Sequence, residues 1–503
     1  MTRPVETVAV VGRDAPAWIA AIALHRAVGK AGVKVEVVEL PSLLSAVDVY
    51  AALPSIHGLH QLLGLDETMV LAASGGVPMV GQRFSNWSGA APPFVHGYDD
   101  TPPPGGDLDF VHYWAKGRLE GLKVPFEDFS LAATSAKQGR VPALIDQDPA
   151  LSATFGLQLD APRYSGLLKQ FAVHLGIGVT GGPIRDVEHN GDRISAVVLG
   201  SGEHVEADLF VDASGTEAAL ISKLAGAEFE PWSGWLPCNR MLSASGPALR
   251  PLPAFSQVSA FRSGWTALHP LRHRTAIVAA YDSQRISDQE MVEALPILTR
   301  LTVAGDAVVS AFRPGIQKRP WVGNCVAVGE AAVALEPLDA VQLHLSHMCI
   351  SHLVTLFPVT ADEFPESSAY SSSVRSLAAN LRDFQCAHYK LNKRFDEPLW
   401  DRARDAAVPD SLQRKLDLFE SLAQAILYDH ETFQQQSWTQ LFVGHGLVPK
   451  GYDPRIERLP DEQHILKVQK RMKDVVAQVH ASPTVDAFLA SAAAPPELVT
   501  SDA

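Results

Sequence analysis

Residues 8–39 read VAVVGRDAPAWIAAIALHRAVGKAGVKVEVVE, and this stretch decides the fold. An apolar run (8–11) meets Gly12, a helical segment follows (18–28), and a second apolar run ends at Glu39. This order of strand, glycine turn, helix and strand is typical of a βαβ unit of the dinucleotide-binding type. We therefore predict one such unit at the start of the chain.

The glycine fingerprint of that unit is altered, because its three places hold Gly12, Asp14 and Ala17. Alanine is tolerated at the third place, and Glu39 stands where an acid binds the ribose. Asp14, however, puts a carboxylate where two phosphates would lie, and like charges about 4 Å apart repel by roughly 4 kcal/mol at an effective dielectric near 20. Alternatively, Asp14 is a plain helix N-cap. In both cases it supplies its own anion at the helix terminus.

Composition indicates a large globular protein that binds neither nucleic acid nor membranes. The 503 residues are 47% hydrophobic, enough for two or three lobes. The net charge of -14, without a basic block, disfavours nucleic acid and anionic membranes. The four cysteines are far apart and form no zinc motif, which favours reduced thiols in a cytoplasmic protein.

Glycine and proline residues indicate where the next elements begin and end. Residues 53–65 have the spacing of a surface helix, and the proline-rich residues 89–109 predict a loop, either a lid or a disordered insertion. Residues 176–181 match GxGxxG, but they follow a helix and precede a strand, so we interpret them as a helix end and a turn. Alternating strands then close on LFVDASG (209–215), which predicts a β-meander returning to the first sheet.

The second half of the chain predicts a second sheet followed by helices. Residues 231–280 suggest a mostly antiparallel sheet, and residues 325–334 a buried strand, Gly329 and a helix that runs on through 335–339. Three apolar stripes at helical spacing predict a helical C-terminal third: Val374, Leu377, Leu381 and Phe384; Leu412, Leu416, Phe419, Leu422 and Ile426; Ile465, Val468, Met472, Val475 and Val479.

Together these segments resemble the flavin-dependent tryptophan halogenase family, from about residue 5 to about residue 455. The resemblance rests on stretches such as VHYWAKGRLEGL, ADLFVDASGTEAALI, WSGWLPCNRML, RPWVGNCVAVGEAAVALEPL, LRDFQCAHYK and SWTQLFVGHGLVPKGYDP. It implies a mixed α/β (α+β) fold: a flavin monooxygenase-like FAD-binding domain (1–88, 155–225 and 320–350), a β-rich substrate lobe (89–154 and 226–319), a helical C-terminal cap (351–490) and a disordered tail (491–503).

The resemblance also implies a chemistry, and the residues for it are changed. In the family, reduced FAD from a separate flavin reductase yields hypohalous acid, which reaches an active-site lysine beside a glutamate. Counting back from Asn86-Trp87 puts Met79 at the lysine place, and a thioether has neither an amine nor a proton to donate. Asp339 holds the glutamate place, and the serine, threonine and glycine that follow it are Ala, Val and Gln here (340–342).

The flavin-facing loop of the family, GVGEAT, reads VDVYAA here (47–52), and the loss of both glycines closes the space for the flavin ring. The WxWxIP signature is reduced to WTALHP (265–270). The resemblance therefore implies weak FAD binding, and it assigns three sets of residues by position. The cofactor set is Gly12, Asp14, Ala17, Glu39, Asp48, Tyr50, Asp212, Gly215, Gly329 and Glu330; the catalytic set is Met79, Asp339, Glu336 and His269; the substrate-pocket set is His96, Trp265 and Trp438.

Several alternatives remain open on the sequence. Asp339, His344 and His347 have a spacing that could hold a metal, although core or capping histidines are the simpler interpretation and we predict no metal. His269 is either a general base or a hydrogen-bonded structural residue. For function, the chain is an impaired or inactive family member that binds a small aromatic ligand or a partner, an active FADH2-dependent halogenase or monooxygenase, or an inactive subunit beside an active paralogue or in a homo-oligomer.

Overall fold

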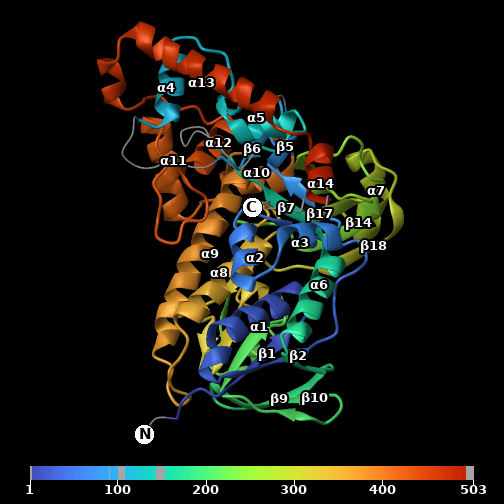
Figure 1. The fold of residues 1–503 in the computed structure, drawn as a ribbon. Coiled ribbons are helices and arrows are strands. Elements are labelled where there is room, and N and C mark those ends of the chain that lie inside the picture. Colours follow the sequence, from blue (N-terminus) through green and yellow to red (C-terminus); the bar gives the residue numbers. More distant parts are fainter. Residues whose placement is uncertain (1–2, 90, 100–107, 143–152, 494–503) are drawn as a thin grey trace, which may run out of the picture.

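The computed structural model describes residues 3–89, 91–99, 108–142 and 153–493 (Figure 1). Much of the predicted loop 89–109 and most of the predicted tail 491–503 therefore lie outside the described residues. Within the loop, Phe94–Gly97 form strand β6, so that part of the loop prediction is wrong. Residues 491–493 complete helix α14 (Val485–Ala493) and do not belong to a tail.

The first sheet has six strands in the order β20-β21-β12-β1-β2-β8. Strand β1 (Thr7–Gly12) lies parallel between β2 (Lys34–Glu39) and β12 (Leu209–Ala213), so the predicted βαβ sheet is confirmed. The other members are β8 (Gly178–Gly181), β20 (Trp321–Val322) and β21 (Cys325–Ala327). A Cβ on Gly12 would lie 2.4 Å from the Ala213 carbonyl oxygen, so the first fingerprint glycine is needed for this close strand pairing.

Two further predictions about the first lobe are confirmed. Helix α6 (Ala161–His174) ends just before Gly176, whose φ is 82°, and β8 follows, so this GxGxxG is a helix end and a turn. Strands β9 (Ile184–Asn190), β10 (Arg193–Leu199) and β11 (His204–Val205) form an antiparallel meander that leads into β12. Helix α1 (Asp14–Val28) buries a continuous run from Ala17 to Leu24.

The second sheet has seven strands, mostly antiparallel as predicted, in the order β18-β14-β17-β16-β15-β5-β6. Its strands from the predicted region and beyond are β14 (Arg240–Gly246), β15 (Phe255–Phe261), β16 (Gly264–Pro270), β17 (Thr275–Tyr281) and β18 (Ala304–Ala311). Strand β5 (Gly81–Ser85) pairs parallel with β15, which draws an N-terminal segment into this sheet. Helix α7 (Asp288–Thr299) packs Met291 and Leu295 against this sheet.

Small sheets and short helices join the two large sheets. Strands β3 (Val49–Ala52), β7 (Gly156–Asp160) and β4 (Val77–Met79) form one of them, and β13 (Phe229–Pro231), β19 (Gly315–Gln317) and β22 (Val333–Ala334) form another. The helix predicted at 53–65 is α2 (Ile56–Leu63), and α3 (Glu67–Ser74) follows it.

The helix predicted through residues 335–339 is wrong. A single 3-10 turn (Gly329–Ala331) is followed by β22 and an irregular segment, and α8 (Gln342–Thr355) begins only later. Pro337 interrupts the helical pattern, and Asp339 and Ala340 have φ values of 62° and 59°. Two consecutive left-handed residues cannot continue a right-handed helix.

The C-terminal third is helical, as predicted, with α9 (Glu366–Lys390), α10 (Pro398–Asp405), α11 (Asp410–Leu422), α12 (Gln435–Gly444), α13 (Asp461–Ala481) and α14. Helices α4 (Phe110–Leu119) and α5 (Leu131–Lys137) come from earlier in the chain. The α9 stripe is fully buried. The predictions of the other two buried stripes are only partly confirmed. Leu422 and Ile465 are 43% and 51% exposed, and Ile426 lies beyond the end of α11.

Figure 1 shows α8 and α9 side by side along the molecule, with β9 and β10 at one end and α13 at the other. All four cysteines are buried and free. Among the described residues, no helix combines the length and apolarity needed to cross a bilayer.

Candidate functional site

The turn between β1 and α1 keeps the backbone of a nucleotide-binding fingerprint. Asp14 has a φ of 57°, the left-handed conformation that glycine favours at such a turn. The N-cap residue of α1 is Arg13, and no side chain hydrogen-bonds to the free backbone N–H groups of the helix terminus. The prediction that Asp14 is the N-cap is therefore wrong. Instead, the Asp14 carboxylate accepts a hydrogen bond from Ser42 Oγ at 2.5 Å. Burial raises the pKa of Asp14 above its usual value.

Tyr50 on β3 reaches the same helix terminus. Burial raises the pKa of Tyr50 above its usual range, and the Asp14 and Glu330 carboxylates add to this, while a hydrogen bond from the Ala15 backbone N–H opposes it. The hydroxyl therefore lies at the first turn of α1, beside the Ala15 backbone N–H. A helix N-terminus of this kind is where a nucleotide phosphate would bind. The structure fills it with a tyrosine and an aspartate.

The acid predicted to bind the ribose is also engaged. Both carboxylate oxygens of Glu39 lie 2.7 Å from Lys169 Nζ, and this ammonium lies over the Trp18 ring. Asp48 accepts hydrogen bonds from the backbone and the hydroxyl of Ser45. Both carboxylates are therefore paired with groups of the protein itself.

Three other residues predicted to bind the cofactor, Asp212, Gly215 and Gly329, lie in or stabilise backbone turns. Asp212 is fully buried and accepts hydrogen bonds from three backbone N–H groups, those of Ser214, Leu220 and Ile221. Gly215 follows in the turn after β12 with a φ of 82°. Gly329 has a φ of 57°, and a Cβ there would lie 2.6 Å from Ser346 Oγ, so only glycine fits. Ala17 is buried in α1.

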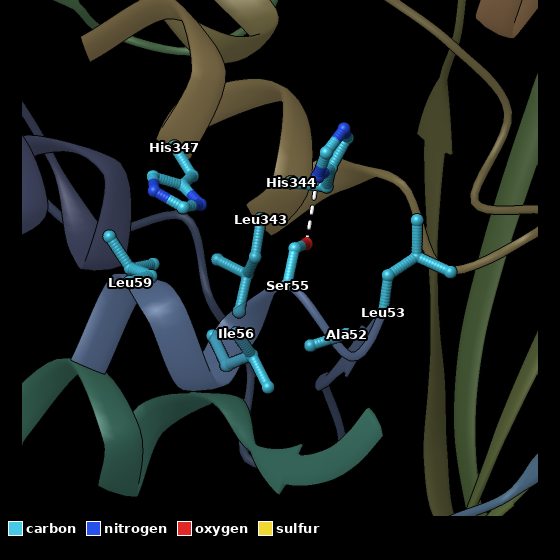
Figure 2. A pocket seen from close by; sticks show the side chains of 8 residues that line it. All are labelled: Ala52, Leu53, Ser55, Ile56, Leu59, Leu343, His344 and His347. Atoms are coloured by element: carbon cyan, nitrogen blue, oxygen red, sulfur yellow. Dashed lines mark hydrogen bonds between the residues drawn. The ribbon is translucent and has the colours of Figure 1, made fainter. Parts of the chain in front are cut away.

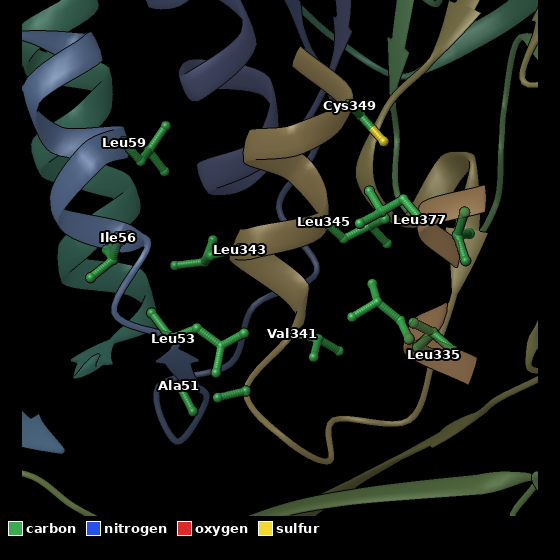
Figure 3. Packing of buried hydrophobic residues seen from close by; sticks show 14 of the residues in the cluster. Ala51, Leu53, Ile56, Leu59, Leu335, Val341, Leu343, Leu345, Cys349 and Leu377 are labelled. Atoms are coloured by element: carbon green, nitrogen blue, oxygen red, sulfur yellow. The ribbon is translucent and has the colours of Figure 1, made fainter. Parts of the chain in front are cut away.

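The space beside the loop 47–52 is packed with apolar side chains. Figure 3 shows Leu53 and Ile56 of the α2 segment facing Leu343, with Val341 and Leu345 in the same cluster. The small cavity between α2 and α8 leaves no space that a water molecule could occupy (Figure 2).

His344 and His347 do not form a metal site with Asp339. Both ring nitrogens of His344 are occupied, Nδ1 by Ser55 Oγ at 2.8 Å and Nε2 by Thr432 Oγ1 at 3.0 Å (Figure 2). Asp339 hydrogen-bonds to a different histidine, His388. Within the described ranges, no three His, Cys, Asp or Glu side chains are placed to hold a metal ion.

Three places must accept FAD in a fold of this type: the N-terminus of α1, the ribose acid and the space for the ring. The first holds Asp14 and Tyr50, the second is bound by Lys169, and the third is filled by Leu53 and Leu343. The residues present therefore do not fit the complete cofactor.

A buried polar cluster surrounds Asp339. Asp339 Oδ1 lies 3.1 Å from His388 Nε2, and His388 Nδ1 lies 2.9 Å from His445 Nε2. Burial raises the pKa of Asp339 to about 7 and lowers the pKa of His388 to about 3, so the histidine is neutral and the contact is a hydrogen bond rather than an ion pair. Sequence reasoning missed both histidines, although the quoted HYK and GHG segments contain them.

His96 and Tyr98 belong to the same cluster. Both ring nitrogens of His96, the Tyr98 hydroxyl and Asp339 Oδ2 are buried and have no partner among the described residues. Burial raises the pKa of Tyr98 above its usual range and the Asp339 carboxylate adds to this, while burial lowers the pKa of His96 to about 4. Four unpartnered polar atoms in one buried region are characteristic of a site that contacts water or a ligand.

Aromatic rings surround this cluster. The Phe84 ring stacks on His388 at 4.3 Å, and Phe384 lies 5.4 Å from His96 and 3.7 Å from Phe433. Trp438 lies behind Phe384 and donates its indole N–H to Glu431. Of the predicted pocket residues, His96 therefore lies at the cluster and Trp438 one layer outside it.

Met79 and His269 have no polar role in this geometry. Met79 ends β4 and is fully buried within the main apolar core. His269 lies on β16, where burial lowers its pKa to about 4, and its Nδ1 has no partner in the described part of the chain.

Glu336 and Trp265 form a second buried network. Glu336 Oε2 accepts hydrogen bonds from Trp265 Nε1 at 2.9 Å and from the Tyr389 hydroxyl at 2.6 Å. Burial raises the pKa of Glu336 to about 7. Gln385 Nε2 donates to the carbonyl oxygens of Glu336 and Leu338, both at 2.9 Å. This network holds the irregular segment that positions Asp339.

Comparisons with known proteins find similarity along nearly the whole chain. The family model described as tryptophan halogenase matches residues 7–461. The tryptophan 7-halogenase KtzQ of Kutzneria sp. (strain 744) is 27% identical over 96% of this chain and 98% of its own length. The flavin-dependent halogenase BrvH from Brevundimonas sp. BAL3 superimposes with a TM-score of 0.90 at 30% identity, covering 97% of this chain and 99% of that one. The flavin-dependent halogenase Xcc4156 from Xanthomonas campestris gives 0.91 at 28% identity, covering 98% and 100%.

Proposed function

Because the chain belongs to the tryptophan halogenase family, we propose that it is a member that no longer halogenates and that uses the retained fold to bind a ligand or a partner. The observation that carries this proposal is the packed space beside residues 47–52, where Leu53 and Leu343 meet and no water-sized space remains. Without room for the ring, the family's oxidant has no place to form.

Met79 supports the same proposal. Halogenation in the family requires an amine or a cation that holds or polarises the oxidant, and a neighbouring carboxylate that takes the ring proton. The thioether of Met79 offers neither charge nor proton. Asp339 keeps a carboxylate, and its hydrogen bond to His388 fixes one of its oxygens. The unpartnered polar atoms of His96, Tyr98 and Asp339 in that cluster suit a small aromatic ligand that binds and does not react.

A second function is favoured by one specific observation. A carboxyl group with a pKa of about 7, linked through His388 to His445, has the properties of a general base. An active FADH2-dependent halogenase or monooxygenase would use Asp339 in that role, and it would need a flavin reductase as partner, as family members do. The filled flavin space argues against this alternative. The role of an inactive subunit beside an active paralogue is compatible with the main proposal.

The test is a halogenation assay on the full-length protein. The chain is incubated with a flavin reductase, FAD, NADH, oxygen, chloride or bromide, and tryptophan or indole, and products are followed by mass spectrometry. An active halogenase such as BrvH serves as the positive control. We expect no halogenated product. A product that depends on both halide and this chain would favour the active alternative.

A further inference from the structure

Helix α13 carries exposed apolar side chains on the face that points away from the protein. The helix lies at the end of the molecule opposite β9 and β10 (Figure 1), and its inner face buries His464, Val468, Val475 and Val479. Since an α-helix turns about 100° per residue, Leu466 lies on the side opposite to His464 and Val468. Leu466 is 61% exposed, and its neighbour Ile465 is 51% exposed. Covering these adjacent side chains with another protein surface would remove apolar area from water.

Charges of opposite sign flank Leu466 on this outer face. Glu462 lies four residues before it and Lys470 four residues after it, so both lie within about 40° of Leu466 around the helix, one turn away on either side. The Lys470 side chain is 74% exposed, and its pair with Asp474 at 2.8 Å is a surface pair of the kind that contributes little to stability. The outer face is therefore acidic before Leu466 and basic after it.

This charge pattern is complementary to itself in one orientation. When two α13 helices meet antiparallel about a two-fold axis at Leu466, residue 462 of one copy lies opposite residue 470 of the other. Each Glu462 then meets a Lys470, and the two Leu466 side chains meet at the centre with Ile465 at their flanks. A parallel pair in register would place Glu462 against Glu462 and Lys470 against Lys470, which is repulsive.

We propose that the outer face of α13 is a dimerisation surface for a second copy of this chain, packed antiparallel with Leu466 at the two-fold axis. Glu462 and Lys470 set the orientation, and the leucine and isoleucine side chains supply the apolar centre. A single helix pair buries less than the about 1,200–2,000 Å² of a standard interface, so the dimer is weak and reversible. The contact uses no residue of the Asp339 cluster or the β1–α1 turn, so it holds or fails independently of the proposed function.

Sedimentation velocity of the full-length protein, from about 1 μM to about 100 μM, measures the association. We expect a reversible shift from monomer to dimer over this range. Leu466→Glu should abolish the shift, because it places two carboxylates at the axis. Glu462→Lys should weaken dimerisation by about tenfold, since it turns two attractive contacts into repulsive ones, and combining it with Lys470→Glu should restore the dimer. Thermal melts of these exposed-site variants should match the wild type and establish that each is folded.

Cross-linking tests the orientation of the two helices. The four native cysteines are buried, so a cysteine introduced on the outer face of α13 supplies an accessible thiol. Leu466→Cys places the two thiols together at the axis. Val476 is 47% exposed on the same helix, and Val476→Cys is the matched control, because its two thiols would lie about 30 Å apart along the helices. A short bis-maleimide should therefore join two copies of the first variant and not of the second.

Three results would overturn the proposal. The first is a wild type that stays monomeric at about 100 μM, and the second is a dimer that Leu466→Glu leaves intact. The third is equal cross-linking of the Leu466→Cys and Val476→Cys variants, which would indicate a parallel or unspecific contact. If the double charge reversal dimerises no better than Glu462→Lys alone, the pairing of Glu462 with Lys470, and with it the antiparallel assignment, is wrong.

Discussion

Met79, which we propose stands at the place of the family lysine, is fully buried, and its surroundings are apolar. We predict that Met79→Lys lowers the free energy of unfolding by about 3 kcal/mol or more, since an unpaired ammonium is costly in such a site. Halogenation should not appear, because the flavin space stays filled and catalytic groups act as a unit. Chemical denaturation and mass spectrometry measure the two effects. Met79→Leu, which conserves volume, should cost less than about 1.5 kcal/mol. A Lys variant as stable as the Leu variant would show that the site admits charge.

Asp339 makes stability depend on pH. Its folded pKa of about 7 exceeds its usual 3.8, so the folded state holds the proton more tightly than the unfolded state. The wild type should therefore be most stable relative to Asp339→Asn below about pH 4, and it should lose up to about 4 kcal/mol of this advantage as the pH rises to about 7. Asparagine tolerates the left-handed φ and can still accept from His388. Denaturation across this range tests the prediction, with Asp306→Asn at an exposed position as control.

A difference in unfolding free energy between wild type and Asp339→Asn that stays constant over that pH range would show that Asp339 titrates normally and is not desolvated.

For single residues, the sequence predicted which residues change but not their contacts. Asp14 was identified by its place in the fingerprint, whereas its hydrogen bond to Ser42 joins two loops and has no sequence pattern. The Asp339, His388 and His445 chain joins three separate segments and was missed for the same reason.

Helices α2 and α8 pack together through side chains such as Leu343, which is 1% exposed. We predict that Leu343→Ala lowers the free energy of unfolding by about 2–5 kcal/mol, the cost of deleting a packed leucine side chain. Leu466→Ala is the matched control, because Leu466 on α13 is 61% exposed and should cost little. Equal small losses in urea denaturation would mean that this region is loosely packed and able to admit a ring.

The elements that could be predicted from the sequence are those with a local signal. The β1–α1–β2 unit combines an apolar strand, a glycine and a helix within 8–39, and the glycines at 176–181 were correctly excluded by their context. The helix predicted through 335–339 overlooked Pro337, which the sequence shows and which disfavours a helix interior, but the path of the irregular segment has no local signal. Only the network of Gln385 and Glu336 sets its path. Strand β5 was missed because its partner β15 lies far along the chain, and β6 joins the sheet only through β5.

At the scale of the whole molecule, the fold of the family is retained. The mixed α/β architecture was predictable because many packing segments resemble the family in order, and the comparisons confirm it over residues 7–461.

Flavin retention by the unmodified protein tests whether the complete cofactor fits this chain. The purified chain is incubated with excess FAD, passed through a desalting column, and examined for visible flavin absorption in the protein fraction. BrvH or another flavin-dependent halogenase treated in the same way is the control. We predict a colourless protein fraction that carries no stoichiometric flavin. One flavin per chain, with an absorption spectrum shifted from that of free FAD, would contradict the account.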